Sequence, residues 1–240
     1  MIKTKPLFLD KSITSNAVHE LYTCPYNVTH ANIDVSYVSN GEEVTFVTLY
    51  ILPVNNDRLP TPGDVYCVDI PVVPKKGPSE TTKILLGPGE TLMVKTKGIK
   101  EGEHINCFVT GQEVNHPHVA RAGRLYNGKV IAGINNELIR VDNLLAGYAS
   151  ATLRILMMND RVPGELKVYV SRGKEPQEQD HIATVIKTPL SKKPAIVKLP
   201  VLKHFESVFV TTDTEDNFIT SLNGVVIRSS KAMEELGYAN

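Results

Sequence analysis

The sequence predicts an all-β protein made of two tandem antiparallel β-sandwich domains related by internal duplication. Apolar and polar residues alternate over short runs, as in Asn32-Ile-Asp-Val-Ser-Tyr-Val, and a two-residue period is typical of strands with one face buried. Glycine and proline turns such as Pro60-Thr-Pro-Gly63 separate these runs. In addition, a turn, strand, loop and strand in the segment Gly87–Val114 occur again in Leu202–Ile227. Repetition of such a unit indicates a duplicated fold.

The duplication extends along both halves at an offset of about 117 positions. The spacing drifts by a residue or two at loops, as insertions between strands would cause. Several segments of the first half align with segments of the second: Phe8-Leu-Asp with Leu125-Tyr-Asn, Ile13 with Val130, Glu20-Leu with Glu137-Leu, Ile33-Asp-Val with Ala151-Thr-Leu, Leu49-Tyr-Ile with Val168-Tyr-Val, Asp64 with Asp180, Glu90-Thr-Leu-Met-Val-Lys-Thr with Glu206-Ser-Val-Phe-Val-Thr-Thr, and Val109-Thr-Gly with Leu222-Asn-Gly.

The first half contains about eight strand candidates, a number that suits a two-sheet sandwich. Both a jelly-roll-like and an immunoglobulin-like topology are compatible with this pattern. The expected strands begin near these residues: Pro6, Glu20, Thr29, Glu43, Asp64, Thr81, Glu90 and Glu103.

These patterns predict an N-terminal sandwich over residues 1–114 and a C-terminal sandwich over 118–228. The linker Asn115-His-Pro-His118 is short, and its proline discourages helix. The remaining residues, 229–240, form a tail outside the repeat. Its Ser229-Ser-Lys-Ala-Met-Glu-Glu-Leu-Gly sequence has serines suited to a cap, helix formers and a glycine stop, so we expect a short helix or an ordered arm.

Charge and cysteine content limit the function classes. The 26 lysines and arginines balance the 26 aspartates and glutamates, and a neutral chain has no electrostatic footprint for nucleic acid or anionic lipid. No apolar run approaches the ~20 residues needed to cross a bilayer, and the start of the chain lacks the features of a secretory signal. The three cysteines, Cys24, Cys67 and Cys107, all lie in the first half. We therefore expect a reducing cytoplasm and buried thiols instead of disulfides.

The sequence predicts no catalytic, cofactor-binding or metal-binding residues. His116 and His118 flank Pro117, but no cysteine or carboxylate stands at a ligand spacing beside them. The acidic stretch Asp213–Asn217 lacks the glycine and the distant glutamate of a calcium loop, which favours a hairpin turn. Gly87-Pro-Gly89 precedes a strand instead of a helix, which argues against a phosphate cradle. Five tyrosines could form a binding platform, although core packing is the favoured interpretation for each: Tyr22, Tyr26, Tyr37, Tyr50 and Tyr66.

Several motifs occur in an order that resembles small β-sandwich virion structural proteins of tailed bacteriophages, of the decoration, neck, tail-accessory and fibre classes. The first half carries a Tyr-Thr-x-Pro turn at Tyr22–Pro25, a strand of the form T-x-A-x-I-x-V-x-x-V-x-N-G at Thr29–Gly41, and L-x-P-G-E-T-L-x-V at Leu86–Val94. Val109-Thr-Gly-Gln-Glu-Val closes this half, whereas the second half has Val225-Val-Ile at the end of the corresponding motif. These motifs consist of turn and strand residues and include no catalytic signature.

The resemblance implies a non-enzymatic structural component of a virion, assembled in the host cytoplasm, that acts as a decoration or accessory protein of head, neck or tail. Its partners would be other virion structural proteins and further copies of itself, with no cofactor, nucleic acid or membrane. An alternative is a receptor- or glycan-binding module of the tail-fibre or adhesin type. An enzyme built on a sandwich scaffold is the third hypothesis, and the absence of a recognisable catalytic motif disfavours it.

Overall fold

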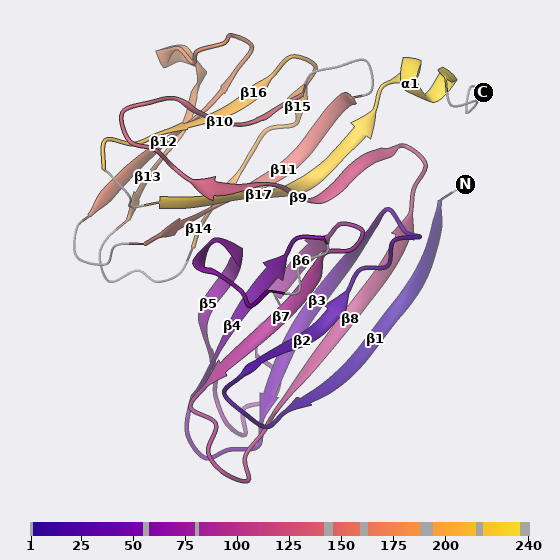
Figure 1. Cartoon of the computed structure of the whole chain (residues 1–240), viewed down its shortest axis with the longest axis vertical. Coiled ribbons are helices and arrows are strands. Elements are labelled where there is room, and N and C mark those ends of the chain that lie inside the picture. Colours follow the sequence, from indigo (N-terminus) through magenta and orange to yellow (C-terminus); the bar gives the residue numbers. More distant parts are fainter. Residues whose placement is uncertain are drawn as a thin grey trace. The chain divides into compact units, whose positions relative to one another are not determined.

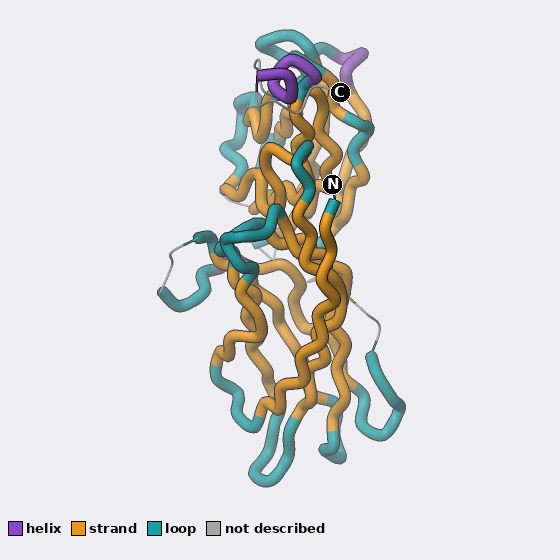
Figure 2. The backbone as a smooth tube through the Cα atoms, turned by 90° about the vertical axis from the view of Figure 1, so that its right-hand side faces the viewer, coloured by secondary structure: helices purple, strands orange, loops and turns teal. Residues whose placement is uncertain are grey.

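The computed structural model describes residues 2–54, 58–79, 82–141, 146–158, 163–187, 194–214 and 218–235, most of them in strands (Figure 2). The chain divides into two compact units, Met1–Pro117 and His118–Asn240. A short helix, α1, covers Ser230–Glu235. The all-β prediction and the predicted short C-terminal helix are therefore confirmed.

The first unit is a sandwich of two four-stranded antiparallel sheets (Figure 1). One sheet has the order β1-β8-β3-β6 and the other the order β2-β7-β4-β5. A 3₁₀ turn, η1 (Pro62–Asp64), precedes β5. The strands are β1 Lys3–Ile13, β2 Val18–Thr23, β3 His30–Ser39, β4 Thr45–Leu52, β5 Val65–Val72, β6 Thr82–Leu86, β7 Thr91–Lys97 and β8 Ile105–Asn115. Each begins within three residues of its expected start.

The second unit repeats this arrangement strand for strand. Its sheets have the orders β9-β17-β11-β14 and β10-β16-β12-β13, with a short additional strand, β15, paired to β11. A 3₁₀ turn, η2 (Glu178–Asp180), again precedes the fifth strand. The strands are β9 Val119–Lys129, β10 Asn136–Arg140, β11 Ala146–Met157, β12 Gly164–Ser171, β13 His181–Lys187, β14 Ala195–Lys198, β15 Leu202–Lys203, β16 Ser207–Thr211 and β17 Phe218–Arg228. Two tandem sandwiches related by duplication are thus present.

The strand order decides between the two topologies that the sequence leaves open. In each unit the first and last strands are neighbours, and the first and second strands lie in different sheets. An immunoglobulin domain keeps its first two strands in one sheet. Eight strands in two sheets with this order form a jelly roll.

Each unit has its own apolar core. In β3 the side chains of Ile33, Val35 and Tyr37 are buried, whereas Asn32, Asp34 and Ser36 lie on the other face. This is the alternation predicted from the sequence. The chain passes between units at His116–His118, because β8 ends at Asn115 and β9 begins at Val119. The finer domain limits, including a separate tail at 229–240, stay a prediction.

One turn is repeated in atomic detail. The Glu90 carboxylate accepts a hydrogen bond from the backbone N–H of Gly87 at 2.8 Å, three residues back, and the Glu206 carboxylate accepts one from Lys203 at 2.8 Å. These turns lead into β7 and β16. The residue before each glutamate has a positive φ, +74° at Gly89 and +66° at Phe205. The second unit therefore keeps the turn although it lacks the glycine that relieves the strain of this conformation.

A glycine in the last strand of each unit lies where the neighbouring strand leaves no room for a side chain. A Cβ atom on Gly111 would lie 2.1 Å from the Asn32 carbonyl oxygen, and one on Gly224 would lie 2.2 Å from the Ser150 carbonyl oxygen. Both glycines stand opposite the middle of the third strand, at Ile33 and Ala151. The aligned motifs Val109-Thr-Gly and Leu222-Asn-Gly thus have a common steric cause.

We expect Gly111→Ala and Gly224→Ala each to lower the free energy of unfolding by about 1–3 kcal/mol or more, because the methyl group must displace the neighbouring strand. Denaturant titration measures the change. Gly102→Ala is the control: its φ is +79°, but no atom lies within 4 Å of the added methyl. This substitution should lower the free energy of unfolding only by the strain of an alanine at a positive φ, about 1 kcal/mol. Equal effects at all three positions would contradict the steric explanation.

Candidate functional site

Strand β1 is an outer strand of its sheet and is exposed along most of its length (Figure 1). It pairs with β8 over eleven successive positions, from Lys3 opposite Asn115 to Ile13 opposite Ile105, without a register shift. The Phe8 side chain, on the outer face, is 69% exposed. A long, regular strand at the edge of a sheet offers unpaired backbone groups to another chain.

The corresponding strand of the second unit differs. Strand β9 pairs with β17 through two register shifts, and several of its residues, including Val119, Ala122 and Leu125, are buried. Bulges twist an edge away from further pairing, and proteins use them to protect exposed edges. After the duplication, therefore, the first unit has the more open edge.

Charged residues limit what β1 can pair with. Its basic residues are Lys3, Lys5 and Lys11, against one acid, Asp10. Lys5 lies 3.6 Å from the buried carboxylate of Glu113 on β8, which also accepts a hydrogen bond from the Tyr22 hydroxyl at 3.1 Å. Lysines on an edge strand discourage pairing with an identical strand and favour a partner that brings carboxylates.

Most of the tyrosines proposed as a platform belong to the first core. Tyr22, Tyr37 and Tyr66 are buried, and the Tyr66 hydroxyl donates to the Lys83 carbonyl at 2.8 Å. Burial raises the pKa of Tyr37 well above its usual value. Tyr50 is half-buried, whereas Tyr26 is exposed and lies against Gly89. The structure does not bring the five rings to one surface, and core packing is correct for the three buried ones.

The cysteines carry free thiols. Cys24 and Cys107 are fully buried and Cys67 is half-buried. Burial, followed by the nearby carboxylate of Glu90, raises the pKa of Cys24 to about 12, and burial raises that of Cys107 to about 12. Buried thiols with a raised pKa react slowly, because the thiolate is the nucleophile.

Near the end of the first unit, His30 and His116 meet at Thr29. The Thr29 hydroxyl donates to the Val114 carbonyl at 2.8 Å, lies 3.1 Å from His30 Nδ1 and accepts from the His116 backbone N–H at 3.1 Å. Since the hydroxyl proton is used, His30 Nδ1 must carry the proton of that contact and donate it. Burial lowers the pKa of His30, and the charge of His116 lowers it further. The sequence draws attention to His116 beside Pro117 but gives no local signal for His30.

The glycine turn and the start of the acidic stretch that the sequence singles out both lie next to strands. The Gly87 turn precedes β7, as predicted. Asp213 and Thr214 follow β16, while positions 215–217 of the acidic stretch lie outside the described residues.

Over the described ranges, no cluster of three or more His, Cys, Asp or Glu side chains is arranged to hold a metal ion. In the same ranges, no helix has the length and apolar character to cross a membrane.

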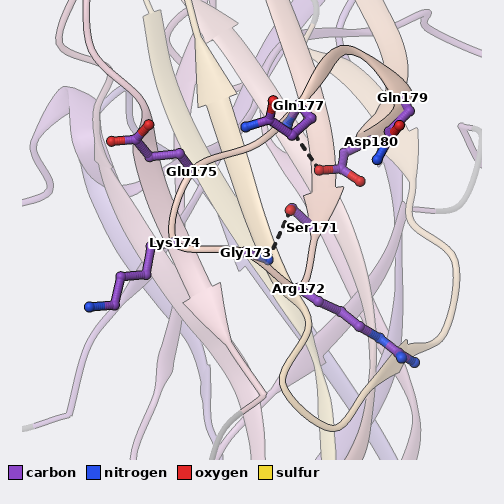
Figure 3. Close-up of a pocket in the computed structure, with 8 residues that line it drawn as sticks. All are labelled: Ser171, Arg172, Gly173, Lys174, Glu175, Gln177, Gln179 and Asp180. Carbon is purple, nitrogen blue, oxygen red and sulfur yellow. Dashed lines mark hydrogen bonds between the residues drawn. The ribbon is translucent and has the colours of Figure 1, made fainter.

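A polar hollow of about 530 Å³ opens on the second unit between the end of β12 and η2. Figure 3 shows the eight residues that line it, from Ser171 to Asp180. The Ser171 hydroxyl accepts a hydrogen bond from the Gly173 N–H at 3.1 Å, and the Asp180 carboxylate accepts one from the Gln177 N–H at 2.9 Å. Sequence reasoning missed this hollow, because its residues come together only through the loop between β12 and β13.

No protein-family model matches the sequence, and a search of the curated proteins found no match. Among solved structures, the MCP of STIV is 12% identical over 100% of both chains, with a TM-score of 0.38. A chain from the atomic structure of Sulfolobus Turreted Icosahedral Virus is 12% identical over 98% of this chain and 93% of its own, with a TM-score of 0.39. The tandem CBM22 domain of Paenibacillus barcinonensis Xyn10C is 8% identical over 95% and 93%, with a TM-score of 0.22. At scores this low, the similarities carry no inference about function.

Thiol labelling tests the burial of the cysteines. In the native protein at pH 8, we expect Cys67 to react with a maleimide well before Cys24 and Cys107, which should react on the timescale of unfolding. Mass spectrometry of peptides from a time course locates each label. Labelling in denaturant is the control and should modify all three equally. Fast native labelling of Cys107 would contradict the structure.

The lowered pKa of His30 predicts a loss of stability in acid. In the unfolded chain the His30 imidazole takes up a proton at about pH 6.5. In the folded protein the same imidazole takes up its proton only at a lower pH. As the pH falls from about 7.5 through about 6.5, the unfolded state takes up the extra proton, so the free energy of unfolding should fall by up to about 1.4 kcal/mol per pH unit. Chemical denaturation at a series of pH values measures the slope.

His30→Gln should flatten this slope whatever its effect on stability at neutral pH. The matched control, His204→Gln, changes an exposed imidazole and should leave the slope as it is in the wild type. An unchanged slope in His30→Gln would show that the buried histidine is not responsible.

Proposed function

We propose that this chain is a structural component of a virus particle and acts through protein–protein contacts. The observation that carries the proposal is the tandem jelly roll, in which the same eight-strand order occurs twice. Jelly rolls of eight strands recur in viral capsid domains, lectins and cupins. Among these classes, the motifs of the first half, such as Thr29–Gly41 and Leu86–Val94, favour the virion proteins that they resemble.

The finer proposal is a decoration or accessory protein of the head, neck or tail of a tailed bacteriophage. It rests on the motif resemblance. Assembly in the host cytoplasm agrees with the three free thiols, since disulfides are rare in a reducing compartment.

The open edge of β1 is the contact surface that we favour. Its regular pairing to β8 leaves the other side of the strand available, and Phe8 adds exposed apolar area at its centre. An edge contact of this kind combines backbone hydrogen bonds with side-chain burial. On a symmetric particle many such contacts act together, so each can be weak.

Quantitative mass spectrometry of purified particles tests the proposal directly. The chain should be present at a copy number set by the symmetry of the shell, neck or tail. Its absence from particles, or its presence only in trace amounts, would refute a structural role.

Replacing an exposed residue on β1 tests the contact surface. We expect Phe8→Glu to abolish incorporation into particles, because it removes apolar area and places a charge at the centre of the contact, while the unfolding free energy changes by about 0.5 kcal/mol or less. Co-sedimentation of the purified chain with particles that lack it measures binding. Ile131→Glu is the control, since Ile131 is 60% exposed but lies in a loop of the second unit. If both variants bind like the wild type, β1 is not the contact surface.

A further inference from the structure

The aspartate turn beside the polar hollow of the second unit has a counterpart in the first unit. Asp64 in η1 and Asp180 in η2 hold the same position: each carboxylate accepts a hydrogen bond at 2.9 Å from the backbone N–H three residues back, of Thr61 and Gln177 respectively. This contact closes the turn before the fifth strand in both units. It is therefore a requirement of the fold and not by itself a functional feature.

The two carboxylates differ in what else they contact. Asp64 is buried, with the Arg58 guanidinium held against it by contacts of 2.5 and 3.0 Å and the Thr61 hydroxyl at 2.7 Å. Asp180 is half-buried at the hollow, where its carboxylate also accepts a hydrogen bond from the Ser171 side chain, and within the described ranges no cation forms an ion pair with it. The carboxylate of the first unit is thus neutralised by a guanidinium, whereas the carboxylate of the second unit has hydrogen-bond partners only and stays half-buried at the hollow.

Charge restricts the class of ligand that suits the hollow. Arg172 is engaged by Glu206 at 3.3 Å, which leaves Lys174 beside Glu175 and Asp180 among the lining residues. The excess of carboxylates disfavours an anionic ligand. The Ser171 hydroxyl is engaged by Gly173 and Asp180, and the side chains of Gln177 and Gln179 include both donors and acceptors. A ligand with neighbouring hydroxyl groups, each able to donate and accept a hydrogen bond, complements these side chains.

An aromatic pair adjoins the hollow. Tyr169 precedes Ser171 by two residues on β12, so both side chains lie on the same face about 7 Å apart. The Tyr169 ring packs against His181, the residue after Asp180, with ring centroids 5.4 Å apart in an edge arrangement. In the first unit, the residues at these two positions are Tyr50 and Val65. The second unit therefore has two rings next to the Asp180 turn where the first unit has one, and aromatic rings pack well against the C–H faces of sugars.

From this arrangement we propose that the hollow of the second unit binds a neutral saccharide. The Asp180 carboxylate accepts hydrogen bonds from its hydroxyl groups, the Gln177 amide donates and accepts them, and Tyr169 with His181 contacts its apolar face. The proposal does not depend on the virion role: a saccharide-binding subsite can belong to a virion protein that contacts a cell surface or to an unrelated lectin.

An array of neutral oligosaccharides of glucose, galactose, mannose and N-acetylglucosamine, probed with the purified full chain, tests the proposal. We expect selective binding to one sugar type. Isothermal titration with the best oligosaccharide should then show affinity reduced about tenfold or more in Asp180→Asn and in Gln177→Ala, because each loses a hydrogen bond made to the ligand.

The two variants differ in their structural risk. Asp180→Asn keeps an oxygen for the Gln177 N–H, and Gln177→Ala changes an exposed side chain, so thermal unfolding should show that both remain folded. Lys167→Gln is the matched control: it alters the same face of β12, outside the hollow, and should bind like the wild type. An array without binding above background, or binding that survives both hollow variants, would overturn the proposal. Neither result would bear on particle incorporation through β1.

Discussion

The pairing of the last strand of each unit with both the first and the third is the constraint on which the fold depends. Strand β8 lies between β1 and β3, and β17 lies between β9 and β11. The backbones approach so closely at Gly111 and Gly224 that any side chain would overlap the neighbouring carbonyl group. Because the first and last strands of a unit are far apart in the sequence, their pairing joins the two ends of each sandwich and carries a large cost in loop-closure entropy.

The two copies of the sandwich have diverged where the shared fold does not constrain them. The glutamate turns before β7 and β16 and the aspartate turns before β5 and β13 persist because they satisfy backbone groups. The first unit keeps a regular outer strand, β1, while the second has a bulged one, β9. Conversely, the first unit pairs Asp64 with Arg58, whereas Asp180 of the second unit is half-buried at a hollow and, within the described ranges, has no ion pair. A tandem repeat can therefore assign different surfaces to different tasks without a change of topology.

Much of the fold follows from local sequence patterns. The alternation in β3, the glycine and proline turns and the repeated glutamate and glycine motifs predict strands that begin close to the observed ones. The candidate surfaces follow less directly. The sequence of Lys3–Ile13 does not show that this strand is a more open edge than the aligned strand of the second half. The difference depends on register, which is regular between β1 and β8 but shifts twice between β9 and β17. His30 and the Tyr169–His181 pair cannot be recognised from the sequence for a similar reason. Their contacts come from residues that are distant in the chain or on the neighbouring strand.

By itself, the sequence determines that this protein is all-β, duplicated and made of short strands, since a two-residue period and turn residues act over a few neighbouring positions. Tertiary structure alone decides that the sandwiches are jelly rolls instead of immunoglobulin folds, which outer strand is open, and which carboxylate faces a hollow. These properties depend on which strands pair across long separations, and such pairings are set by the closure of the whole core.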